Sequence, residues 1–99
     1  MTGDAIVLWV SMVARKGTAP AMRQAIETVA AISRSEEGCQ IYQLLEDPRE
    51  PERFRLLERW RDRKKFEAHQ KSAHLADGFK RMAALQAEAP TFERWQAID

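Results

Sequence analysis

The fold of this chain is decided by the stretch AIVLWVSMVA, residues 5–14. In an extended strand, successive side chains point to opposite faces of the sheet. Both faces are apolar here, with Val7, Trp9 and Val13 on one and Ile6, Leu8, Val10 and Met12 on the other. A strand that is apolar on both faces is covered on both faces. We therefore expect a strand over Ala5–Ala14 that is buried between two layers.

Signals for a helix follow this strand. Gly17 breaks the extended stretch, Thr18 is in position to cap a helix, and Pro20 suits the first turn. Between residues 21 and 32, apolar side chains recur at helical spacing and form one stripe for burial. Gly38 then turns the chain.

The rest of the chain predicts a hairpin, a helical region in two parts and a last strand. The hairpin is predicted because the link between its two strands, residues 47–52, is short and is too polar and proline-rich to be a helix or a strand. Asp62 is placed to cap the first helical part, and Pro90 ends the second. The predicted segments are Cys39–Glu46, Arg53–Arg61, a helix from Asp62, a helix after Ala73, and Thr91–Ile98.

The predicted order is β-α-β-β-α-β, the split βαβ arrangement of a ferredoxin-like α+β fold. Such a fold places its helices on one face of a four-stranded antiparallel sheet. Residues 1–99 therefore form a single domain, and the apolar open face, which includes Trp95, would meet water in a monomer. Since an exposed apolar patch of this kind marks an interface, we expect a homodimer with two-fold symmetry, packed through the open sheet faces.

Composition narrows the class of function. Lysine and arginine number 16 against 15 acidic residues and are interleaved with them, so we expect no nucleic-acid partner. The apolar run near the N-terminus is too short to span a bilayer, so we expect no membrane association. The one cysteine, Cys39, is interpreted as a small apolar filler and fits a reducing, cytoplasmic location. Without a CxxC motif or a Cys/His cluster, we expect no metal.

The third predicted strand carries a candidate acid or base. Alternation places Phe54, Leu56, Glu58 and Trp60 on one face of this strand. A carboxylate in such an apolar layer holds its proton more tightly, which suits general acid or base catalysis. The alternative for Glu58 is a structural ion pair with an arginine such as Arg94.

Two histidines follow this strand. His69 comes three residues after Phe66, so both side chains can face the sheet from one side of a helix. An imidazole titrates near neutral pH and is a candidate base, although His69 could equally be a packing residue. His74 falls at the break between the two helical stretches, where it would either react or cap a helix.

The aromatic residues of this region have two interpretations each. Trp60 would form a pocket wall that stacks on a planar ring, or would pack in the core. Tyr42, the only tyrosine, would donate a hydrogen bond into a pocket or pack in the sheet. We expect Trp60, Tyr42 and Phe66 to contact a bound substrate.

Several short motifs together resemble one known family. They are Gly17, Glu36-Glu37-Gly38-Cys39, Asp47-Pro48, Glu58-Arg59-Trp60, His69 and Ser72-Ala73-His74. In this order they resemble the antibiotic biosynthesis monooxygenase (ABM) domain, from Ile6 to Trp95. The resemblance implies a dimeric α/β barrel built from two ferredoxin-like domains. Members of this family include cofactor-free enzymes that oxidise quinols or polycyclic phenols with molecular oxygen, enzymes that degrade haem, and isomerases of a phosphorylated autoinducer-2 sugar.

Departures from the family pattern argue against haem degradation. The chain has no asparagine, and Val10 stands about where the haem-degrading members, and some of the polyketide-oxidising ones, have one on the first strand. Phe79 stands about where their haem-binding histidine would be. The pair of His69 and His74 resembles the quinol-oxidising and the autoinducer-modifying members alike.

The resemblance, together with the candidate site, implies a cofactor-independent monooxygenase. Its substrates would be molecular oxygen and a small aromatic, a quinol or phenol. His69 would take the phenolic proton, Glu58 would orient or relay it, and Trp60 would stack on the ring, with His74 as a third catalytic candidate.

Two other functions remain open at this point. One is an isomerase of a phosphorylated, autoinducer-like sugar, for which Arg61, Arg63 and Lys64 would supply an anion site. The other is a non-catalytic dimer that binds a small ligand, in which Glu58 and His69 are locked by structural partners with no cavity beside them.

Overall fold

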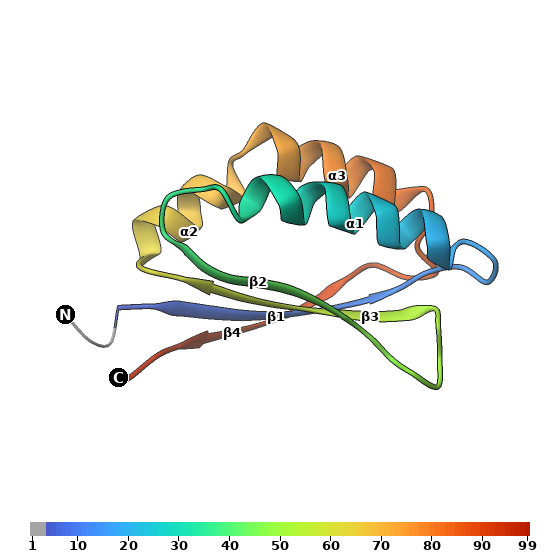
Figure 1. The fold of residues 1–99 in the computed structure, drawn as a ribbon, viewed down its shortest axis with the longest axis horizontal. Helices are drawn as coiled ribbons and strands as arrows, with labels where there is room; N and C mark the ends of the chain where they lie inside the picture. Colours follow the sequence, from blue (N-terminus) through green and yellow to red (C-terminus); the bar gives the residue numbers. More distant parts are fainter. Residues whose placement is uncertain (1–3) are drawn as a thin grey trace.

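The computed structural model describes residues 4–99 as one sheet covered by helices. The elements are β1 (Ile6–Val13), α1 (Ala19–Ser33), β2 (Cys39–Glu46), β3 (Arg53–Trp60), α2 (Arg63–Gln70), α3 (Ala73–Ala83) and β4 (Thr91–Gln96). The four strands are antiparallel, in the order β2-β3-β1-β4. Figure 1 shows all three helices on the same side of the sheet. The predicted ferredoxin-like α+β fold is confirmed, with its second helical region divided into α2 and α3.

The main difference from the predicted elements is the end of α3. This helix ends at Ala83 and not at Pro90, because the residues after it pair with the end of β1. The amide of Arg15 donates to the carbonyl of Leu85 with an N–O distance of 2.8 Å. A backbone that meets a neighbouring strand in this way cannot continue its helical hydrogen bonds.

The helices begin where we predicted, but only one of the two expected side-chain caps is formed. Asp62 accepts a hydrogen bond from the backbone amide of Lys65 at 2.9 Å and so satisfies a free amide in the first turn of α2. Thr18 precedes α1 without capping it. Its hydroxyl lies instead 2.7 Å from the carbonyl oxygen of Arg15 and 2.9 Å from that of Leu85, which places the start of α1 against the segment after α3.

The predicted turn at Gly38 also brings two distant segments together. Gly38 has a φ of +90°, in the left-handed region that favours glycine. A β-carbon at this position would lie 2.4 Å from Cγ of Lys65, so the absence of a side chain lets α2 approach the loop between α1 and β2. This approach matters because Glu36 lies in that loop.

The core lies between the sheet and the helices. Along β1, buried residues alternate with half-buried ones, so within one chain only one of its two apolar faces is fully covered, and not both as predicted. The helices cover only one face, and on the other face Trp95 is 58% exposed. In the described part of the chain, none of the helices is long and apolar enough to cross a membrane.

Packing between α1 and α3 predicts a strong effect at Gly78. A β-carbon on this residue would lie 2.2 Å from Cγ2 of Val29, whose branched side chain has little freedom to move. We expect Gly78→Ala to lower the free energy of unfolding by about 1–3 kcal/mol through overpacking, even though alanine is the better helix former. Urea unfolding measures this, with the exposed neighbour Asp77→Ala as control. A Gly78→Ala protein as stable as wild type would contradict the packing described here.

Candidate active site

An apolar cavity of about 340 Å³ lies between the helices and the sheet. Every helix and strand contributes to its wall, which is mostly aliphatic and aromatic. Its polar side chains are Tyr42, Glu58, His69, Gln70 and Arg94. A largely apolar cavity with a few convergent polar groups is the usual form of a small-molecule site.

The sheet register places Glu58 in the middle of the cavity floor. Glu58 pairs with Tyr42 on β2 and with Leu8 on β1, and Leu8 pairs with Arg94 on β4, so one row crosses the sheet. The Glu58 side chain is 3% exposed and accepts a hydrogen bond from Nε1 of Trp60 at 2.9 Å. Burial raises the pKa of Glu58 to about 7, and the Trp60 hydrogen bond offsets only part of this effect.

His69, in the last turn of α2, approaches Glu58 from the helix layer. Its ring is 2% exposed and stacks on the indole of Trp60, with ring centroids 4.4 Å apart. Nδ1 of His69 lies 2.6 Å from Oε2 of Glu36, and Nε2 lies 3.7 Å from Oε1 of Glu58. The first contact is a strong hydrogen bond, while the second is too long to be one. His69 therefore lies between two carboxylates but is hydrogen-bonded only to that of Glu36.

Glu36 sets the protonation pattern of this imidazole. A carboxylate accepts hydrogen bonds, so the short contact assigns the ring N–H of His69 to Nδ1 and leaves Nε2 as an acceptor. Burial lowers the pKa of His69, and the hydrogen bond and charge of Glu36 oppose this effect. The result is a neutral, buried imidazole whose free nitrogen is directed toward Glu58.

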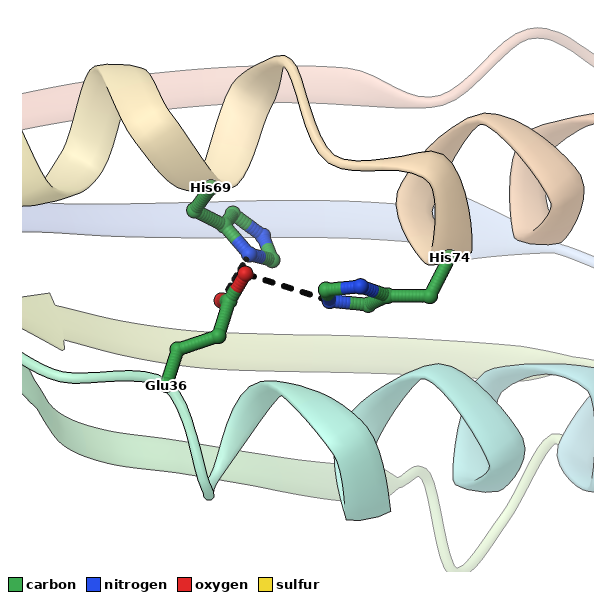
Figure 2. Close-up of side chains that lie close together, drawn as sticks. All are labelled: Glu36, His69 and His74. Carbon is green, nitrogen blue, oxygen red and sulfur yellow. Dashed lines mark hydrogen bonds and ion pairs between the residues drawn. The ribbon is translucent and has the colours of Figure 1, made fainter.

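Glu36 also reaches His74, which lies at the start of α3. Figure 2 shows the Glu36 carboxylate between the two imidazoles. Its Oε1 lies 3.4 Å from Nε2 of His74, and the hydroxyls of Ser33 and Ser72 lie 3.2 and 3.4 Å from the same nitrogen. His74 does not contribute to the cavity wall. Its connection to the cavity runs through Glu36 and His69.

The three predicted aromatic contacts divide into two groups. Tyr42 and Phe66 line the cavity, and the Tyr42 ring meets the His69 ring edge-on, with centroids 5.5 Å apart. Burial raises the pKa of the Tyr42 hydroxyl well above its ordinary value, so it stays protonated. Trp60 is fully buried and is not part of the wall. Its indole supports His69 and Glu58 from behind, so it is not placed to stack on a ligand.

The structure also corrects the expected charges around the cavity. Glu58 and Arg94 form no ion pair; the Arg94 guanidinium lies over the ring of Phe66 instead, 4.9 Å from its centroid. The basic residues Arg61, Arg63 and Lys64 are absent from the cavity wall. Arg61 pairs with Glu37 and Asp62 on the outside of the molecule.

Sequence reasoning did not place several residues in the wall of the site or beside it. Glu36 entered only as part of a family motif, and its role depends on a contact with His69 that spans 33 positions. Phe79 and Phe92, whose ring centroids lie 6.4 Å apart, form the more exposed end of the cavity with Arg94. The signal for Phe92 and Arg94 was their alternation on the last strand, which places both on the helix-covered side.

Fold and site together define a ferredoxin-like α+β protein with a small-molecule cavity and a buried carboxylate–imidazole pair. The sequence profile described as Antibiotic biosynthesis monooxygenase matches residues 5–81 of this chain. The chain belongs to this family. None of the curated proteins compared with it matches.

Solved structures are similar over nearly the whole chain. The protein PA3566 from Pseudomonas aeruginosa is 25% identical with a TM-score of 0.90, covering 100% of this chain and 99% of its own. The protein SO0527 from Shewanella oneidensis is 25% identical with a TM-score of 0.89, covering 95% and 91%. A candidate antibiotic biosynthesis monooxygenase from Nitrosomonas europaea is 23% identical with a TM-score of 0.91, covering 99% and 94%, and at this identity it supports the fold alone.

Proposed function

We propose that this protein is a cofactor-independent monooxygenase that oxidises a small aromatic, a quinol or phenol, with molecular oxygen. The observation that carries the proposal is the apolar cavity of about 340 Å³ with Glu58 and His69 in its wall. Its volume is at the lower end of small-molecule sites, which suits a substrate of one or two rings. Family membership supports the same class of reaction.

The geometry supports a role for each polar group. Nε2 of His69 is the free imidazole nitrogen and accepts the phenolic proton, while Glu36 holds the Nδ1 proton and stabilises the imidazolium that forms. Glu58, with a pKa of about 7, can hold or release a proton at neutral pH and relays it beside the ring. The phenolate passes an electron to oxygen far more readily than the phenol does. A quinol and molecular oxygen give a hydroxyquinone and water, so the substrate itself supplies the electrons.

Oxygen consumption tests this proposal. The metal-free protein is incubated with a panel of hydroquinones and naphthols, and uptake is followed with an oxygen electrode against each substrate alone. We expect catalysed uptake with at least one member of the panel. A protein that consumes no oxygen with any of them would count heavily against the proposal.

One observation keeps the isomerase as a second candidate. Among the lysines and arginines of the described residues, only Arg94 lines the cavity, at its more exposed end. It could hold a phosphorylated ketone whose enolisation uses His69 and Glu58, whereas Arg61, Arg63 and Lys64 lie outside. In that case Arg94→Gln would weaken binding of a phosphorylated substrate. The cavity beside Glu58 and His69 argues against the non-catalytic alternative, which expected none there.

We expect the protein to be a homodimer packed through the open face of the sheet. Trp9, Leu57 and Trp95 share this face, and helices cover the other. A second copy is a suitable occupant because the face carries both signs of charge, as in Arg55 and Glu93, and so can be complementary to itself across a two-fold axis. Light scattering at micromolar concentration should give the mass of two chains. A monomeric mass would remove this prediction.

A further inference from the structure

A cluster of three metal-ligating side chains lies beside the cavity, on the outer side of His69. Glu36 comes from the loop after α1, His69 from α2 and His74 from α3 (Figure 2). One ligand atom from each lies within 4.8 Å of the others. No other group of this kind occurs among residues 4–99.

We propose that Glu36, His69 and His74 bind a divalent transition-metal ion, with Zn²⁺ as the best fit. Two imidazole nitrogens and one carboxylate are a ligand set that zinc prefers, with a fourth position left for water. At zinc–ligand distances of about 2.1 Å, ligand atoms of a tetrahedral site are about 3.4 Å apart. Oε1 of Glu36 already has this spacing from Nε2 of His74, at 3.4 Å, while the other carboxylate oxygen, Oε2, lies closer to Nδ1 of His69, at 2.6 Å. Small side-chain rotations would therefore open the cluster enough for an ion.

The surroundings of the cluster favour this assignment. His74 and Glu36 are 16% and 22% exposed, so an ion can reach them from solvent, whereas His69 is held in place by its stack on Trp60. The nearby cations do not compete for Glu36, because Arg61 and Lys65 pair with Glu37. A metal-binding histidine commonly directs its other ring nitrogen toward a carboxylate.

Glu58 lies close to that second position. Its Oε1 is 3.7 Å from Nε2 of His69, so a small side-chain movement would bring it within hydrogen-bond distance. With an ion bound, Glu58, His69 and the ion would follow one another as carboxylate, imidazole and metal. This arrangement orients the histidine ligands of many zinc sites. The cluster thus has its three ligands close together without the ion, and a carboxylate near the other ring nitrogen of His69.

Metal binding and the base function of His69 exclude each other. An ion on Nδ1 replaces the proton that Glu36 now accepts, so the ring N–H must move to Nε2. An imidazole in that state cannot accept a proton from a substrate in the cavity. Zn²⁺ should therefore inhibit the oxygenase. This consequence rests on the proposed function, but the binding itself does not.

Metal titration tests the site directly. The full-length protein, free of any affinity tag, is titrated with Co²⁺ while its visible absorption is recorded, and Zn²⁺ is then used to displace the cobalt. We expect one ion per chain and loss of the cobalt spectrum on adding Zn²⁺. Glu36→Gln and His74→Gln should each weaken binding by at least about 100-fold, because removal of a ligand costs more than loss of an outer partner.

The matched control is Glu67→Gln, which changes an exposed carboxylate of α2 outside the cluster and should bind as wild type does. Circular dichroism confirms that each variant is folded, and the two ligand variants involve partly exposed side chains. The proposal is overturned if cobalt does not saturate one site at micromolar concentrations, or if both ligand variants bind as tightly as wild type. A protein that binds the metal but consumes no oxygen would support this site and contradict the proposed function. Failure of the metal site and failure of the proposed function can therefore be distinguished.

Discussion

His69→Gln should lower the rate of oxygen uptake by about 10²–10⁴-fold, the usual contribution of a general base. Glutamine fills most of the imidazole volume and can still donate an amide hydrogen to Glu36, but it cannot accept a proton. The buried position of His69 between Glu36 and Glu58 leaves no other imidazole in the cavity wall to replace it. Steady-state oxygen consumption with the best substrate of the panel measures the effect.

His74→Gln is the informative comparison. His74 is outside the cavity wall and touches the base only at the edge of its ring and through Glu36, so its replacement should reduce the rate much less than the loss of His69 does. Urea unfolding of both variants separates an effect on chemistry from an effect on stability. Equal activity in wild type and His69→Gln would show that His69 is a packing residue, which was its alternative interpretation.

Glu58→Gln should make the protein more stable at alkaline pH. The pKa of Glu58 is about 7 in the folded protein against 4.5 for the free group. Between these values the folded protein holds a proton that the unfolded chain has released, so stability falls as the pH rises from 4.5 to 7. The loss amounts to roughly 3 kcal/mol, at 1.36 kcal/mol per pKa unit. Glutamine has no proton to lose and can still accept the Trp60 hydrogen bond.

Urea unfolding at pH 5 and pH 8 measures this effect as a difference between wild type and Glu58→Gln. We expect the variant to gain stability over wild type at pH 8 and to show little gain at pH 5. Glu37→Gln is the control, since Glu37 is exposed and the hydrogen bond and charge of Lys65 lower its pKa. A gain of the same size at both pH values would mean that Glu58 does not titrate as its burial indicates.

Alternation and helical spacing predicted which face each site residue occupies. Glu58 points into the helix-covered face of β3, and His69 points inward from α2 beside Phe66, as predicted. These patterns are local, because the backbone geometry of a strand or helix alone determines the direction of a side chain. They did not show that Trp60 lies behind the cavity, since a side chain on the correct face can still be covered by a neighbour such as His69.

The contacts that define the chemistry could not be predicted from these local patterns. Glu36 meets His69 across 33 positions only because the glycine turn lets α2 approach the loop after α1. The predicted end of α3 was wrong for a related reason. A distant backbone partner, Arg15, stops the helix before Pro90. In both cases the deciding interaction joins segments that are far apart in the chain.

By itself, then, the sequence determined the class of fold, the order of its elements and the inward direction of Glu58 and His69, because hydrophobic periodicity depends on local backbone geometry. The tertiary structure alone decided which side chains meet. Packing of three helices on one sheet face placed Glu36 between two histidines, left a cavity in front of Glu58 and kept the basic residues outside it. Such contacts depend on the relative positions of whole elements, which no local pattern specifies.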